Sequence, residues 1–181
     1  MNSSGIESLY RPLALAEARI ARCMMASSYD RRGGNHDWSN YIRREGNAAV
    51  MMEAEGPGCI TRIWTADPQK GTVRIFLDRH PKPIIECPFA QLFDQLPLSQ
   101  GIGGESPEHY EQSKAESVPM GLTSYCPIPF ERHIKVTIDP EDDYLYYQIN
   151  ADIYPAGTPI ESFVAPPNQP NPTVCLAVNA I

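Results

Sequence analysis

The chain has 181 residues, enough for one domain with a buried core. Its 22 acidic and 15 basic residues give a formal net charge of −7, and the sequence has no basic run. Nucleic-acid binding needs a clustered positive face, so no nucleic-acid partner is expected. No apolar run approaches the roughly 20 residues that cross a bilayer, and the start MNSSGIESLYRP lacks a secretory signal. We therefore expect a cytoplasmic protein with no membrane partner.

Proline and cysteine usage narrow the fold class. Proline makes up 18 of the 181 residues. Because proline is excluded from helix interiors and central strands, many short strands between fixed turns are expected. The five cysteines are odd in number and scattered, without a CxxC pair, which favours buried reduced thiols over a disulfide framework. They are Cys23, Cys59, Cys87, Cys126 and Cys175.

The chain begins with a helical pattern. Residues 6–25 place leucine, alanine, isoleucine and methionine at near-helical spacing, which predicts one amphipathic helix. Residues 1–26 are accordingly assigned to an N-terminal helical segment, and residues 27–181 to a single sandwich domain.

After residue 47 the hydrophobic period changes to two. Residues 48–55 and 59–67 read as two strands joined by a tight turn at Gly56-Pro57-Gly58. Further predicted strands, a short helix and a long loop follow; they are strands at 72–78, 82–87, 121–130, 131–139, 144–154 and 173–181, the helix at 88–96 and the loop at 97–117. This pattern predicts an all-β jelly-roll sandwich with an N-terminal helix. An immunoglobulin-like sandwich is less favoured, because the connections are uneven and no Cys–Trp–Cys spacing is present.

Residues 27–41, SSYDRRGGNHDWSNY, concentrate the polar chemistry of the chain. Two adjacent glycines let the backbone approach a ligand closely, and the residues around them offer charges, amides and a flat ring. Such a loop suits a polyhydroxylated ligand such as a sugar, although an Asx-rich surface turn would look similar. The candidate substrate-binding residues are Asp30, Arg31, Asn35, His36, Asp37 and Trp38.

No catalytic residue is assigned. Asp30 and Asp37 are the only acidic pair on this loop, but Arg31 and Arg32 should lower the pKa of a neighbouring carboxyl group, whereas a general acid needs a raised pKa. Structural or substrate-orienting roles are therefore favoured for both. The histidines share no metal-ligand spacing, so no metal site is expected, and those other than His36 are read as surface or turn residues.

Five segments resemble, in order, one family of glycoside hydrolases. They are SSYDRRGGNHD, GPGCITRIW, RIFLDRHPKPIIECPFAQLF, SYCPIPFERHIKVTID and YYQINADIYPAGTPIESF. The family is the α-D-fructofuranosidase and difructose-dianhydride synthase/hydrolase group, and the resemblance covers about residues 8–164. It implies a double jelly roll, trimers or multiples of trimers, substrates with furanose rings and no cofactor.

The resemblance also limits the function. The family's two catalytic carboxylates lie downstream, one in a GTGTEDYF signature that this sequence does not contain. We therefore expect the N-terminal jelly roll of a furanoside-active glycoside hydrolase, which binds a furanose-containing oligosaccharide and makes homo-oligomer contacts without performing the chemistry itself. The alternative is a non-catalytic jelly roll used for self-assembly or carbohydrate binding. Of the two tryptophans, Trp38 is predicted in the pocket, and Trp64 in the core beside a covering Arg62.

Overall fold

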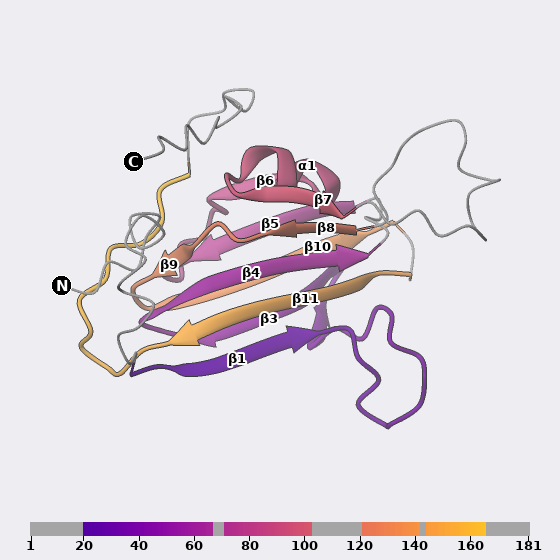
Figure 1. Cartoon of the computed structure of the whole chain (residues 1–181), viewed down its shortest axis with the longest axis horizontal. Coiled ribbons are helices and arrows are strands. Elements are labelled where there is room, and N and C mark those ends of the chain that lie inside the picture. The colour runs from indigo at the N-terminus through magenta and orange to yellow at the C-terminus, as the bar shows by residue number, and fades with distance from the viewer. Residues whose placement is uncertain (1–19, 67–70, 103–120, 142–143, 166–181) are drawn as a thin grey trace, which may run out of the picture.

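The computed structural model describes residues 20–66, 71–102, 121–141 and 144–165. Two antiparallel sheets stack face to face, with one short helix at their edge (Figure 1). The elements in chain order are β1 (Arg22–Ser27), β2 (Arg43–Glu45), β3 (Ala48–Glu55), β4 (Gly58–Ala66), β5 (Gly71–Leu77), β6 (Ile85–Pro88), α1 (Phe89–Gln95), β7 (Ser99–Ile102), β8 (Gly121–Ser124), β9 (Ile128–Phe130), β10 (His133–Pro140) and β11 (Tyr146–Ile153).

The strand order is that of a jelly roll. One sheet runs β1-β11-β4-β8-β7, with β9 also paired to β4, and the other runs β2-β3-β10-β5-β6. Eight of these strands, renumbered one to eight in chain order, fall in the orders 1-8-3-6 and 2-7-4-5. They are β1, β3, β4, β5, β6, β8, β10 and β11. The first and last strands of a jelly roll are neighbours in this order, so the predicted fold class is confirmed.

The core lies between the sheets and follows from the period-two patterns. In β5, Val73, Ile75 and Leu77 are buried, while the residues between them are only partly buried. The same alternation buries Tyr147 and Ile149 of β11. Helix α1 then adds Phe89, Leu92 and Phe93 to the core from the sandwich edge.

The predicted N-terminal helix is wrong over its last residues. Residues 22–27 form β1, which pairs along its whole length with β11, so the sandwich already includes residue 22. The inward Met24 and Ala26 alternate with the exposed Cys23 and Met25, which is a strand period. The rest of the predicted helix lies outside the described residues, except for residues 20 and 21, which are not helical.

The predicted hairpin between residues 48–55 and 59–67 is also wrong, although both strands exist. The strand β3 pairs with β2 and β10, whereas β4 pairs with β8, β9 and β11, so the turn joins opposite sheets. Buried residues of both strands belong to the one core cluster between the sheets, among them Met51 and Met52 of β3 and Ile60 and Ile63 of β4. The Phe130 ring packs so closely on this corner that an added Cβ at Gly58 would lie 2.5 Å from it.

The predicted loop at 97–117 is wrong at its start, and two other predictions lie outside the described residues. Strand β7 occupies the start of the predicted long loop, as a short edge strand paired with β8. The remainder of that loop, the last predicted strand and Cys175 lie outside the described residues. No helix in the described part of the chain is long and apolar enough to cross a membrane.

The cysteine prediction is confirmed for three of the four described cysteines. Cys59, Cys87 and Cys126 are buried, and Cys23 is exposed on the edge strand β1. Burial raises the pKa of Cys87 to about 11 and that of Cys126 to about 12, so both stay protonated thiols at neutral pH.

Candidate functional site

The polar segment singled out in the sequence forms the loop of residues 28–40, which projects from the end of β1 (Figure 1). Both ends of this 28–40 loop are bonded to the chain around β11. The backbone N–H of Ser28 donates to the Tyr147 carbonyl at 3.1 Å, and the Tyr147 N–H donates to Ser28 Oγ at 3.1 Å. At the other end, the Ser39 N–H donates to the Leu145 carbonyl at 2.8 Å, and the Leu145 N–H donates to Ser39 Oγ at 3.0 Å. The loop is thus anchored on a central strand.

Tyr147 connects the loop to the core. Its side chain is buried, and its hydroxyl donates to the carbonyls of Asn40, at 3.1 Å, and Met51, at 3.3 Å. Burial raises the pKa of Tyr147, so the hydroxyl keeps its proton. The Asn40 amide in turn donates to the carbonyls of Ser28, at 2.8 Å, and His36. These bonds close the base of the loop.

The two aspartates of the loop accept backbone hydrogen bonds. Asp37 Oδ1 accepts the Asp30 N–H at 2.7 Å, and Asp30 Oδ1 accepts the Arg32 N–H at 2.9 Å. The Arg32 N–H is the largest cause of the lowered pKa of Asp30, and the Arg32 guanidinium adds to it. The lowered pKa of Asp30 is therefore confirmed. The sequence analysis gave the arginine charges as its cause, whereas the main cause is a backbone N–H. An ionised, buried carboxylate that accepts two donors from Arg32 organises the loop and does not supply a proton.

The glycine pair permits this arrangement. Gly33 has a φ of +78°, a left-handed conformation that glycine adopts without strain. A Cβ added at Gly34 would lie 2.5 Å from Asp30 Oδ2, so the second glycine makes room for the carboxylate. The loop conformation therefore depends on both glycines and on Asp30.

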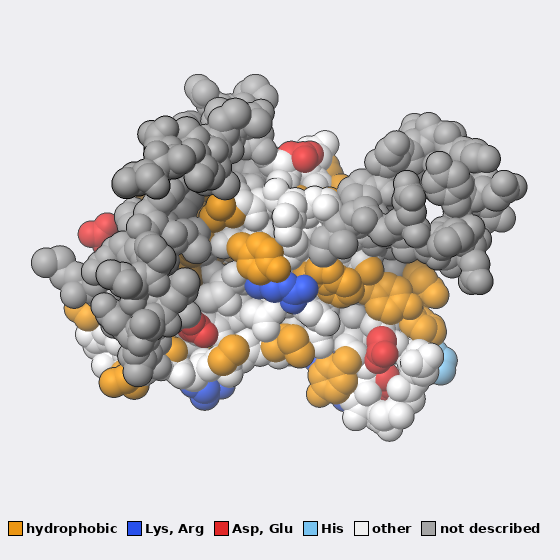
Figure 2. Space-filling view, viewed as in Figure 1, with side chains coloured by type: hydrophobic (Ala, Val, Ile, Leu, Met, Phe, Trp, Pro, Cys, Tyr) orange, Lys and Arg blue, Asp and Glu red, His pale blue; other side chains and the backbone are white. Residues whose placement is uncertain are grey.

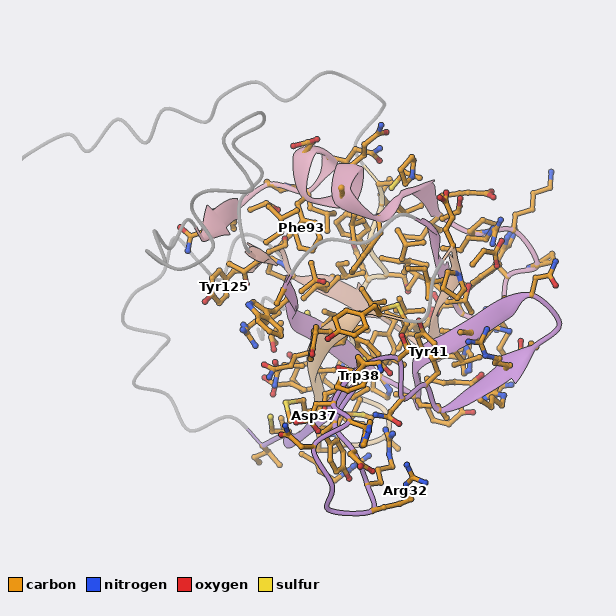
Figure 3. All side chains as sticks on the ribbon, turned by 90° about the vertical axis from the view of Figure 1, so that its right-hand side faces the viewer. Arg32, Asp37, Trp38, Tyr41, Phe93 and Tyr125 are labelled. Carbon is orange, nitrogen blue, oxygen red and sulfur yellow. The ribbon has the colours of Figure 1, made fainter. Side chains whose placement is uncertain are left out.

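The other predicted site residues lie on the outside of the loop. Arg31 lies over the Tyr29 ring at 4.9 Å and donates to two backbone carbonyls, and Asn35 and His36 are exposed. Trp38 is half-buried, with its ring centroid 5.0 Å from that of His36. Figure 3 shows Trp38 and Asp37 at the base of the loop and Arg32 near its tip.

Trp38 belongs to an aromatic cluster that the sequence analysis missed. Its ring stacks on Tyr144 at 5.2 Å and meets the edge of Tyr146 at 6.3 Å, and the two tyrosines are 5.7 Å apart. A hydrogen bond with Tyr144 is the largest cause of a raised pKa at Tyr146, with smaller contributions from burial and from the Asp37 charge. The signal was present in YLYY, where alternate tyrosines lie on the same face of a strand.

The outer face of the six-stranded sheet carries the second tryptophan. Trp64, predicted in the core, lies instead on this outer face, because the neighbouring Ile63 and Thr65 are the buried residues of β4. The predicted Arg62 contact is present, with the guanidinium carbon 5.8 Å from the Trp64 ring centroid. Figure 2 shows hydrophobic side chains gathered around Lys or Arg atoms at the middle of this face.

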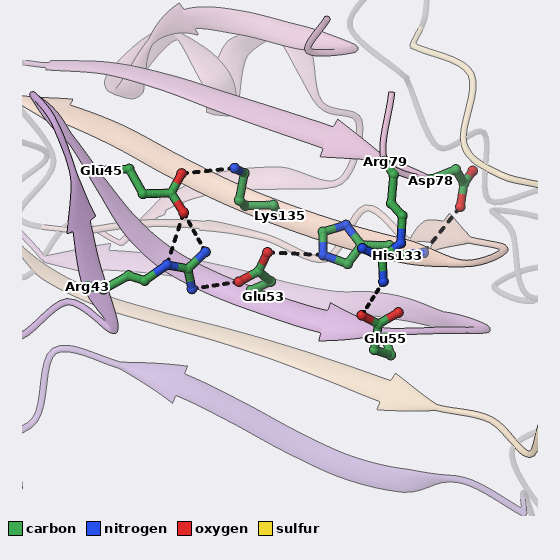
Figure 4. A network of polar contacts seen from close by, with 8 residues as sticks. All are labelled: Arg43, Glu45, Glu53, Glu55, Asp78, Arg79, His133 and Lys135. Atoms are coloured by element: carbon green, nitrogen blue, oxygen red, sulfur yellow. Dashed lines mark hydrogen bonds and ion pairs between the residues drawn. The ribbon is translucent and has the colours of Figure 1, made fainter. Parts of the chain in front are cut away.

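The opposite outer face, on the five-stranded sheet, carries paired charges (Figure 4). Arg43 contacts Glu53 at 2.6 Å as well as Glu45, and Lys135 contacts Glu45 at 3.0 Å. His133, predicted at the surface or in a turn, is instead buried on β10, with Nε2 3.1 Å from Glu53. Its Nδ1 atom is buried without a hydrogen-bond partner among the described residues. The charges on this face largely neutralise one another.

No metal site is visible in the described part of the chain, where no three histidine, cysteine, aspartate or glutamate side chains come together. The family model described as GH172 first beta-sandwich domain matches residues 20–170. A search of the curated proteins gave no significant match.

Proposed function

Because the chain belongs to the GH172 family, as its first β-sandwich domain, we propose that it is the furanoside-binding first domain of a glycoside hydrolase. The observation that carries the proposal is the 28–40 loop, a polar segment whose backbone is fixed by Asp30, Asp37 and Asn40 beside the exposed edge of an aromatic cluster. Sugars are bound by a few placed polar groups and a ring on which the sugar stacks.

The exposed loop residues supply those groups. Asn35 and His36 are exposed, and both carry hydrogen-bond donors and acceptors suited to hydroxyl groups. Trp38 offers a ring that Tyr144 and Tyr146 hold in place. Since Asp30 and Asp37 serve the loop backbone, the domain contributes binding, and the acid/base chemistry belongs to carboxylates outside this chain. Trimeric assembly and a cytoplasmic location remain predictions.

The test is a titration of the full chain with fructofuranose and arabinofuranose trisaccharides by calorimetry. We expect at least one of them to bind the unmodified chain, and the Trp38→Ala variant to lose that binding. Because Trp38 is only half-buried, the variant should lose about 1 kcal/mol of unfolding free energy, the size of one or two aromatic pair contacts.

Phe76→Ala is the matched control. Phe76 is also a partly buried aromatic residue, with Lys135 Nζ 5.5 Å from its ring, but it lies on the outer face of the opposite sheet. Its removal should leave furanoside affinity unchanged. Binding that survives in Trp38→Ala, or that falls equally in Phe76→Ala, would contradict the proposal.

A further inference from the structure

Arg62, at the middle of the six-stranded sheet, is held by two amide side chains. Its Nη1 donates to Gln148 Oε1 at 2.8 Å and to Asn150 Oδ1 at 3.4 Å, both on the neighbouring strand β11. A guanidinium has no acceptor, so the amide atoms that face it must be the oxygens. The NH₂ groups of Gln148 and Asn150 are therefore left to donate elsewhere, and neither has a partner among the described residues.

Trp64 lies in the same row of side chains. It is the cross-strand partner of Gln148 in β11 and of Thr123 in β8, so these three side chains lie on the same side of the sheet, where Thr123 is buried. The Arg62 guanidinium carbon is 5.8 Å from the ring centroid, whereas a group stacked flat on the ring would lie nearer, at about 4 Å. The guanidinium therefore lies over the ring without stacking flat on it.

This row lies on the same strand face as one member of the loop's aromatic cluster. Tyr146, which meets Trp38 edge-on at 6.3 Å, precedes Gln148 by two residues on the same face of β11. Two residues of a strand span about 6.6 Å, which is close to the length of one sugar residue. Because Gln148 is the cross-strand partner of Trp64, the row leads from the aromatic cluster at Trp38 toward Trp64 and Arg62.

We propose that Trp64, Arg62 and Gln148 form a second sugar subsite, so that the site takes an oligofuranoside of at least two residues. The inference rests on the proposed function of the 28–40 loop. The guanidinium and amide N–H groups donate to sugar hydroxyls, and Trp64 supplies the stacking face. Fixed N–H donors beside an aromatic ring are the groups that bind a sugar.

The experiment uses the fact that the chain has only two tryptophans, Trp38 and Trp64. Trp38→Phe leaves Trp64 as the sole indole reporter, and Trp64→Phe leaves Trp38. Each variant is titrated with fructose and with fructofuranose disaccharides and trisaccharides while indole fluorescence is recorded. We expect Trp38 to respond to all three ligands, and Trp64 to respond only to the disaccharide and trisaccharide.

Affinity gives the second measurement. In the unmodified chain the disaccharide should bind about tenfold more tightly than fructose, and Trp64→Ala or Gln148→Leu should remove that increment while leaving fructose affinity unchanged. Phe76→Ala is again the control.

The outcomes separate the two proposals. Equal affinity for fructose and the longer ligands, with no Trp64 response, would overturn the second subsite and leave the loop site intact. No response of Trp38 to any ligand would instead overturn the proposed function. A change of native mass in Trp64→Ala, measured by light scattering, would show that this face contacts another protein chain and would overturn the subsite.

Discussion

Gly34 determines where the Asp30 carboxylate can lie. A Cβ at this position would stand 2.5 Å from Asp30 Oδ2, which is far inside van der Waals contact. The carboxylate would have to rotate, and the hydrogen bond from the Arg32 N–H would be lost. We therefore expect Gly34→Ala to weaken furanoside binding about tenfold or more, measured by calorimetry.

Gly46→Ala separates this effect from ordinary glycine strain. Gly46 has a φ of +63° and nothing within 4 Å of an added Cβ, so its replacement carries only the cost of a left-handed alanine, about 1 kcal/mol. It lies between β2 and β3, outside the loop, and should bind sugar normally. Equal binding by Gly34→Ala and Gly46→Ala would contradict the role of Gly34.

Single residues could be predicted where their effect is local. The lowered pKa of Asp30 could be predicted because its main cause, Arg32, lies only two residues away in the sequence. Trp64 was wrongly predicted in the core, because its hydrophobicity favoured burying the indole. In β4, the buried residues Ile63 and Thr65 alternate with Arg62 and Trp64, which face outward. The cross-strand partner Gln148, which lies between the buried Tyr147 and Ile149, shows which face is outside.

At the scale of elements, Asp78 joins three segments. Its Oδ1 accepts the backbone N–H groups of Arg132, at 2.7 Å, and His133, at 3.3 Å, and its Oδ2 accepts the Ser162 hydroxyl. Ser162 Oγ also accepts the Glu131 N–H at 2.9 Å. The end of β5 thereby fixes both the turn before β10 and the segment around Ser162.

Replacing this carboxylate should destabilise the fold in a pH-dependent way. Burial alone would raise the pKa of Asp78, but the hydrogen bonds from Ser162 and from the two N–H groups outweigh it and lower the pKa. A lowered folded-state pKa stabilises the protein above the unfolded value of about 3.9, and this contribution is lost as the pH falls below it. Asp78→Ala should cost about 1–3 kcal/mol at pH 7, measured by urea denaturation, and the difference should shrink below pH 4.

Asp139→Asn is the matched control for Asp78→Ala. Asp139 pairs with Arg74 at 2.7 Å on the partly exposed outer face of the five-stranded sheet, where an ion pair contributes at most about 1 kcal/mol. A loss as small for Asp78→Ala as for Asp139→Asn, or a difference that does not change with pH, would show that Asp78 does not join these segments.

Strands and helices could be predicted where the apolar residues within the element repeat regularly. β3, β5 and α1 lie within a residue or so of their predicted ranges, because each has a regular apolar pattern. The edge strands β1 and β7 were missed, since six residues of RCMMAS and four of SQGI carry little alternation of their own. Their strand conformation comes from pairing with β11 and β8, which a local reading does not contain.

For the whole molecule, the jelly-roll order makes the first and last described strands neighbours. β1 is the edge strand of the six-stranded sheet, and all six of its residues are paired with β11, from Arg22–Ile153 to Ser27–Gln148. It also covers the part of the core next to Ala26 and Met24. The period-two segments and turns predicted a sandwich, but not that residues 22–27 complete it, because this pairing joins segments more than 120 residues apart.

A comparison of two shortened chains tests how much β1 contributes. A chain that starts at residue 20 keeps β1, and one that starts at residue 28 exposes the edge of β11 and the core beside it. We expect the shorter chain to lose at least about 2 kcal/mol of unfolding free energy relative to the longer one, as for removal of a large apolar side chain. An unpaired edge also favours association, so the shorter chain should form larger species in light scattering. Equal stability and equal mass would place the start of the sandwich after β1, at the boundary near residue 27 that the sequence suggested.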